Sequence, residues 1–343
     1  MRFNSVNRII LFGGAPLLAA AARDLQAAGF EVFAFTSPRH AAEPVTAGGE
    51  RLDTVLAGVG VPFWVTADIN TDANLMGLIT ASTLGIGMGE AWSFGRPLID
   101  AFGGQLVDFM GIPLPRYRGG AHYSWMILTG ERRMACNIQL IDEHMVQGEH
   151  DSGAIVFHRE YQLDSQVRIP RDYFQAAVPA ELAFIRDFLA KINAGHDFPL
   201  EVPDERASLF FPRLSTAAHG WIDWSWTGKA IERFICAFDE PYPGACTLLG
   251  EQVACLRAAT LDEGEPFHPF QSGLIVRVGE EEGIVVATTS GLLTMRRART
   301  ASGDSLPTIR PGMRFFTPRA LLEDALRDQV RYDSGGIRPA KPG

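Results

Sequence analysis

The first third of the chain alternates short apolar runs with glycine turns and helix-like stretches. An apolar run, a glycine turn, an alanine-rich helix closed by glycine and a second apolar run follow one another over residues 8–12, 13–14, 16–28 and 30–35. Further strands are expected at residues 62–65 and 84–88, with a connecting segment over 71–79. This order is typical of parallel strands joined by helices. It predicts an α/β fold with a doubly wound, Rossmann-like N-terminal domain.

The turn at Gly13 and Gly14 has two interpretations. The GxGxxG spacing of a dinucleotide site is missing, because Ala15, Pro16 and Leu17 occupy the next positions. The turn is then either purely structural, which we favour, or it holds a phosphate or carboxylate of a ligand at the start of the helix.

The second half of the chain predicts a smaller, mainly β domain. A long amphipathic helix over residues 171–192 is followed by a polar stretch over 193–207 that contains glycine and prolines. A short helix at 227–238 and strands at 245–249, 253–258, 273–278 and 283–288 suggest a small OB-like barrel or an open sandwich. A final helix at 318–330 has Thr317 as its expected N-cap and Pro318 as its first residue, before a loose tail. We therefore divide the chain into residues 1–198, 199–304 and 305–343.

Charge and composition exclude several classes of function. The 343 residues include 40 acidic residues against 31 lysines and arginines, a net charge of −9, which disfavours a nucleic-acid partner. The absence of a long apolar run or a secretory leader predicts a cytoplasmic protein without a membrane partner. The cysteines, which show no CxxC spacing, are expected to be buried free thiols rather than metal ligands or disulfides, at positions Cys136, Cys236, Cys246 and Cys255.

Three segments resemble one enzyme family. A Pro-Leu-Pro-Arg-Tyr-Arg-Gly-Gly turn occupies residues 113–120, and an Asp-Ser-Gly-Ala-Ile segment follows a predicted strand, over 151–155. The third segment, Phe-Ile-Cys-Ala-Phe-Asp-Glu-Pro-Tyr-Pro-Gly-Ala, lies at residues 234–245. Together they are similar to the folate-dependent formyltransferases, which include methionyl-tRNA formyltransferase and the sugar N-formyltransferases. The resemblance implies transfer of a formyl group from N10-formyltetrahydrofolate to an amine, without a metal.

The family's catalytic residues are only partly present. Its Asn-x-His pair falls on Asp108 and Met110, whereas its later aspartate is kept as Asp151. An ionised Asp108 would repel the oxyanion of the tetrahedral intermediate, and Met110 neither accepts a proton nor donates a hydrogen bond. Losing one oxyanion donor costs on the order of 10² to 10³ in rate. His122 is the best candidate for a relocated base, and a packing or solvated histidine is the alternative.

The resemblance also implies positions for the two substrates. The glycine-rich strand end at residues 85–95 matches part of the family's pterin pocket, which nominates Gly89, Trp92 and Phe94, with core packing as the alternative for both aromatic side chains. The loop over residues 142–150, which contains His144 and His150, has two equally supported interpretations. Either Asp142 and His144 contact the folate, or the loop is simply exposed to solvent. The residues expected to border the amine are Arg116, Tyr117, Arg118 and Gly119.

Three functional hypotheses follow. The stretches at residues 119–125 and 221–226 look more like those of the sugar-directed members of the family. The first hypothesis is therefore N-formylation of a small-molecule amine, with a nucleotide-linked amino sugar as the expected substrate. The second is a pseudoenzyme that binds a ligand or a partner such as a second copy or an active formyltransferase paralogue. The third keeps the pocket and uses Asp108 as a carboxylate base in another one-carbon or acyl transfer.

Overall fold

Seven strands from the first half of the chain form one sheet in the computed structural model, which describes residues 1–46, 48–141, 153–334 and 336–338. Their spatial order is β3-β2-β1-β4-β5-β7-β8. The first five strands are parallel, and β7 and β8 are antiparallel additions at one edge. The bounds are β1 (Arg8–Gly13), β2 (Glu31–Thr36), β3 (Phe63–Val65), β4 (Thr83–Met88), β5 (Leu106–Met110), β7 (Arg133–Leu140) and β8 (Ile155–Gln162). This confirms the predicted Rossmann-like sheet.

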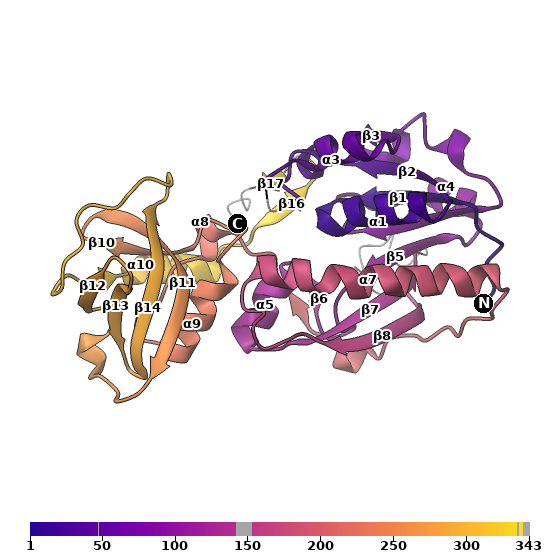
Figure 1. Ribbon diagram of the computed structural model, residues 1–343. Coiled ribbons are helices and arrows are strands. Elements are labelled where there is room, and N and C mark those ends of the chain that lie inside the picture. Colours follow the sequence, from indigo (N-terminus) through magenta and orange to yellow (C-terminus); the bar gives the residue numbers. More distant parts are fainter. Residues whose placement is uncertain (47, 142–152, 335, 339–343) are drawn as a thin grey trace.

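Helices cover both faces of this sheet (Figure 1). Their bounds are α1 (Ala15–Ala27), α2 (Pro38–Ala41), α3 (Leu52–Val59), α4 (Arg96–Phe102), α5 (His122–Thr129) and α7 (Pro170–Asn193), with 3-10 turns at Ile69–Thr71 and Met76–Leu78. Because the parallel strands are buried on both sides, their sequences are nearly continuous apolar runs. Among the described residues, no helix is both long and apolar enough to cross a bilayer.

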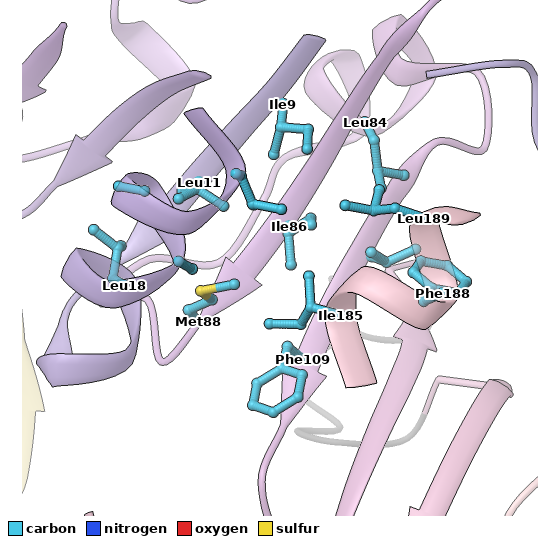
Figure 2. Close-up of a cluster of buried hydrophobic side chains, with 14 of the residues drawn as sticks. Ile9, Leu11, Leu18, Leu84, Ile86, Met88, Phe109, Ile185, Phe188 and Leu189 are labelled. Atoms are coloured by element: carbon cyan, nitrogen blue, oxygen red, sulfur yellow. The ribbon is translucent and has the colours of Figure 1, made fainter. Parts of the chain in front are cut away.

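The hydrophobic core between the sheet and α7 holds the end of β5 in place. Figure 2 shows Ile86 and Phe109 of the sheet facing Ile185 and Phe188 of α7. These four side chains are buried, and each contributes roughly 1.5–3 kcal/mol on leaving water. Successive strand residues point to opposite faces, so Asp108, which precedes Phe109, points to the α4 side of the sheet.

The second half of the chain forms the expected mainly β domain, an antiparallel sheet whose strand order is β12-β13-β14-β11-β10-β15. Leu274, before β12, bridges to Arg314, before β15, so the two edge strands meet and the sheet curls toward a barrel. The bounds are β10 (Ala245–Leu249), β11 (Gln252–Glu263), β12 (Ile275–Gly279), β13 (Gly283–Thr288), β14 (Gly291–Thr300) and β15 (Phe315–Phe316), with a 3-10 turn at Pro269–Gln271. Helix α9 (Gly228–Ala237) lies between this sheet and α5, where Ser124 Oγ donates to Ala237 O at 2.8 Å.

Short elements connect the two sheets. Strand β6 (Arg118–Gly119) pairs with β9 (Phe210–Phe211), and Ile155 of β8 bridges to Glu201. A 3-10 turn (Glu205–Ala207) precedes β9, and α8 (Thr216–His219) follows it. The polar stretch after α7 therefore runs back along the first sheet before the chain enters the second.

Two expectations for the C-terminal end are wrong. Helix α10 (Arg319–Arg327) has Pro318 as its N-cap residue, not Thr317. The Thr317 hydroxyl is buried and lies 3.1 Å from the Thr247 hydroxyl, so it is not available to cap the helix. The tail is not uniformly loose either, because β16 (Arg331–Asp333) and β17 (Gly336–Arg338) form a hairpin whose Ser334 carbonyl accepts a hydrogen bond from Arg39 N.

Candidate active site

In open α/β sheets the ligand crevice lies outside the carboxyl ends of the strands at the topological switch point, which here are β1 and β4. The chain turns from β1 toward β2 and later returns to β4 on the other side of β1, which makes this the topological switch point where open α/β sheets bind ligands. A side chain at Gly13, whose φ is +128°, would collide with the Met88 carbonyl, and one at Gly14 would collide with the His40 ring. Close packing thus requires both glycines, which supports the structural interpretation of the turn.

Asp108 lies at the end of β5, beside this crevice. Its backbone neighbours are Gly87 on β4 and Gln139 on β7, and only 3 % of the residue is exposed. A Cβ atom at Gly87 would lie 2.8 Å from Asp108 Oδ1 and 2.7 Å from Glu90 Oε2. The missing side chain at Gly87 therefore makes room for two carboxyl groups.

Met110 brings no acid or base to the crevice. Its thioether side chain is half-buried and packs against the apolar cluster around Ile112. Asn137 on β7, which is opposite Met110, donates hydrogen bonds from Nδ2 to the carbonyls of Met110 at 3.3 Å and Ile112 at 2.6 Å. The amide thereby fixes the backbone directly after β5.

Most residues of the turn that was expected to bind the amine are packed against other parts of the protein. Tyr117 is fully buried and its ring stacks on Phe211 at 5.2 Å. Arg118, also buried, forms two hydrogen bonds of 2.6 and 2.8 Å with the carboxylate of Glu205. Gly119 has a φ of +106° and lies against the Phe211 carbonyl, whereas Arg116 is exposed. Arg116 is therefore the side chain of this turn that is most accessible to a ligand.

His122 is the first residue of α5 and lies next to the Gly119–Gly120 backbone. Burial, together with the Arg213 guanidinium, lowers the pKa of His122 to about 4, against a smaller opposing effect from a hydrogen bond with the Gly119 backbone. Burial also lowers the pKa of His40 to about 3. Both rings are neutral at physiological pH, and a base whose pKa is this low is poorly matched to proton transfer near neutrality.

The three pterin candidates differ in their surroundings. Phe94 is buried, packs edge-to-face on Phe12 with 5.2 Å between the ring centroids, and belongs to the core. Trp92 is half-buried and donates from Nε1 to Ala67 O at 3.0 Å. Gly89 has a φ of +68° and open space where a Cβ would be. Of the three, Gly89 offers backbone that a planar ligand can approach.

Four candidates, Asp142, His144, His150 and Asp151, lie outside the described residues. Within the described part of the chain, no group of His, Cys, Asp and Glu side chains has the arrangement of a metal site. All four cysteines are free and buried, as the sequence predicts.

Glu90 and Glu181 had no role in the sequence analysis, although Glu181 is buried and Glu90, half-buried, has its Oε2 out of contact with solvent. Glu90 directly follows the glycine-rich end of β4, where a carboxylate in an otherwise apolar segment was the available signal. Glu181 lies on α7, on the same helical face as Ala177, Phe184 and Ile185, and is only 3 % exposed. A charged residue within the apolar stripe of an amphipathic helix indicates an unusual environment.

Comparison with known proteins agrees with this fold. Residues 215–308 match the family described as "Formyl transferase, C-terminal domain". A methionyl-tRNA formyltransferase of Synechococcus sp. (strain JA-2-3B'a(2-13)) is 28% identical over 247 residues, which are 70% of this chain and 73% of the relative.

Two solved structures share the architecture at lower sequence identity. HypX from Aquifex aeolicus has a TM-score of 0.59 at 17% identity over 88% of this chain, which spans only 45% of the HypX chain. WlaRD, a sugar 3N-formyl transferase solved in the presence of dTDP and 5-N-formyl-THF, also has a TM-score of 0.59, at 13% identity over 85% of this chain and 97% of its own. Residues 215–308 therefore match the formyl transferase C-terminal domain, and the chain as a whole shares the fold of these two solved structures.

Proposed function

We propose that the protein transfers a formyl group from N10-formyltetrahydrofolate to the amino group of a nucleotide-linked amino sugar. The observation that supports this most is the placement of Asp108 at the end of β5, beside Gly87 at the switch-point crevice. A sugar 3N-formyl transferase with the same fold was solved with dTDP and 5-N-formyl-THF, which supports both substrate classes.

In this proposal the turn after β5 and the end of β4 face the substrates. Arg116, exposed on the turn, attracts an anionic part of the amine substrate, and Gly89 lets the pterin approach the backbone. Tyr117 and Arg118 hold the turn in place through Phe211 and Glu205. Asp142, His144 and Asp151 keep the roles that the family resemblance implies for them.

A second candidate function is a pseudoenzyme. Met110 favours the pseudoenzyme, because the Met110 side chain packs against apolar neighbours. By the family resemblance, this is the position of the histidine that transfers a proton. Such a protein retains a ligand or binds a partner, either a second copy of itself or an active formyltransferase paralogue. The two candidates differ in turnover, and only the enzyme requires folate binding.

Calorimetric titration with a stable N10-substituted tetrahydrofolate analogue is the first test, followed by a formyl-transfer assay on a panel of amines that includes nucleotide-linked amino sugars. Binding with turnover supports the enzyme, and binding without turnover supports the pseudoenzyme. The double variant Asp108→Asn with Met110→His then shows whether restoring the family pair creates activity. Absence of folate binding in the intact wild-type chain would refute the enzyme and favour a pseudoenzyme that binds a partner, which a pull-down then tests.

A further inference from the structure

Two cysteines face each other across neighbouring strands of the second sheet. Cys246 on β10 is the register partner of Cys255 on β11, and their Sγ atoms lie 3.6 Å apart. Both thiols are free in this structure. A tight turn at residues 250–251 joins the two strands, so the hairpin itself brings the sulfur atoms together.

The backbone around Cys246 shows which kind of cross-strand pair this is. Cys246 N donates to Gly220 O at 2.6 Å, and Cys246 O accepts from Ile222 N at 2.8 Å. Both backbone groups of Cys246 therefore point away from β11, which makes Cys246 and Cys255 a non-hydrogen-bonded pair. The Cα atoms of such pairs are about 4.5 Å apart, and disulfides span Cα distances of roughly 4.4 to 6.8 Å. The strands are thus already at a spacing that a disulfide can bridge.

The pair lies on the outer face of the sheet. Ala254 and Leu256, on either side of Cys255, belong to the apolar core, so the Cys255 side chain points to the opposite face. The β14 partner of Cys255 is Arg299, an exposed residue on that same face. Only 6 % of Cys246 and 4 % of Cys255 is exposed, which restricts reaction at the two sulfur atoms to small reagents.

The surroundings of the pair favour a thiolate at one of the two positions. A hydrogen bond from the Cys246 thiol and the charge of the Arg257 guanidinium lower the pKa of Cys255 to about 7, although burial opposes this shift. The same hydrogen bond and burial raise the pKa of Cys246. Arg257 is held beside the pair by Pro243 O at 2.8 Å and by the Glu240 carboxylate at 3.4 Å. Because the thiolate is the reactive form of cysteine, Cys255 is the nucleophile of the pair.

We propose that Cys246 and Cys255 form a redox-sensitive modification site, at which a peroxide converts the two free thiols into a reversible disulfide between β10 and β11. This inference is independent of the proposed formyl transfer, because it uses no residue of the candidate active site. The disulfide ties β10, whose backbone holds Gly220 and Ile222 where the chain enters the second sheet, to β11.

The oxidation balances with hydrogen peroxide as the oxidant. The Cys255 thiolate attacks one peroxide oxygen, the O–O bond breaks, and the departing hydroxide leaves as water with the proton that Cys255 had released. The Cys246 sulfur then attacks the sulfur of the Cys255 sulfenic acid, the S–O bond breaks, and the disulfide forms. The proton of Cys246 leaves with the hydroxide as a second water. The two thiols give up two electrons, which reduce the peroxide, and an added dithiol reverses the reaction by exchange.

Thiol counting and peptide mapping of the full-length protein, treated with hydrogen peroxide while folded, test the site. We expect the thiols that can be alkylated in urea to fall from four per chain to two, and to return to four after dithiothreitol. Trypsin combined with a glutamate-specific protease cuts after Glu251, between the two cysteines, so their peptides stay joined only through a disulfide. Unchanged thiols, or lost thiols without joined peptides, would overturn the proposal.

Single substitutions identify the two partners. Cys246→Ser leaves Cys255 without a thiol to condense with, so peroxide should consume one thiol per chain and yield a sulfenic acid that dimedone traps. The matched controls are Cys136→Ala and Cys236→Ala, which remove buried thiols outside the pair and should keep the joined peptides. A joined peptide in Cys246→Ser, or its loss in a control variant whose circular dichroism spectrum shows the native fold, would assign the disulfide to other cysteines and refute the site.

Discussion

The carboxyl group of Glu181 should make the protein more stable in acid than at neutral pH. It lies inside the molecule, against the backbone of Gly111, and the hydroxyl of Tyr123 is 3.5 Å away. Burial raises the pKa of Glu181 from 4.5 to about 8, and the Tyr123 hydroxyl opposes this shift only in part. The folded protein therefore keeps a proton that the unfolded chain releases.

The sign and size of the effect follow from the two pKa values. Below the unfolded pKa of 4.5 the group is protonated in both states, so it has no effect there. As the pH rises toward the folded pKa of about 8, unfolding releases a proton and stability falls by about 1.4 kcal/mol per pH unit. At about pH 7 the accumulated loss is about 3 kcal/mol.

The variant Glu181→Gln tests this, because glutamine has the shape of the neutral acid and cannot ionise. Its free energy of unfolding in urea should exceed that of the wild type by about 3 kcal/mol at about pH 7 and match it at about pH 4. Glu160→Gln, an exposed carboxylate on neighbouring β8, is the control and should leave the pH dependence unchanged. Parallel stability curves for wild type and Glu181→Gln would refute the reasoning.

Three further predictions concern packing around the site. Ile185→Ala removes a fully buried side chain beneath β4 and β5 and should cost about 3 kcal/mol in urea unfolding; a loss below about 1 kcal/mol would contradict its placement. Glu205→Gln takes the charged partner from buried Arg118, and since Glu205 itself is largely exposed the expected loss is about 1–2 kcal/mol by the same measurement. Gly119→Ala should separate β9 from β6, because a Cβ at φ +106° would strike the Phe211 carbonyl; limited proteolysis should then cut residues 205–213 faster than in wild type, and equal rates would contradict this.

The parallel strands were predictable because burial on both faces of the sheet produces nearly continuous runs of apolar residues. The expected strand at residues 8–12 corresponds to β1 (Arg8–Gly13), and the expected helix at 171–192 corresponds to α7 (Pro170–Asn193). Glycines mark the ends of these elements, so their bounds differ by only a residue or two. The antiparallel edge was harder: β8 (Ile155–Gln162) carries exposed polar residues on most of its length and was not identified as a full strand.

Strand β14 (Gly291–Thr300) was missed for a related reason. Its second half is rich in arginine, and Arg297 forms an ion pair of 2.6 Å with Glu240 on the exposed side of the sheet. Strand β11 was expected to end near Ala258, which has a φ of +53°, but the pairing with β14 continues beyond it. Cross-strand partners supply what local propensity lacks, and those partners are visible only once the sheet is formed.

The candidate site also depends on partners from neighbouring strands that the sequence alone does not reveal. Asp108 and Met110 were matched to the family's pair by counting back from Pro115 of the turn at residues 113–120, because both lie in one continuous stretch of sequence; no finding tests that match. Glu90 follows a different strand, β4, and its carboxyl group lies near that of Asp108 only because Gly87, which is next to Asp108 in the register of β4 and β5, has no side chain to separate them. The pairing of strands thus brings together side chains that no continuous motif contains. The match of Met110 to the family's histidine is for this reason an incomplete argument against catalysis, and the double variant Asp108→Asn with Met110→His is the one that tests it.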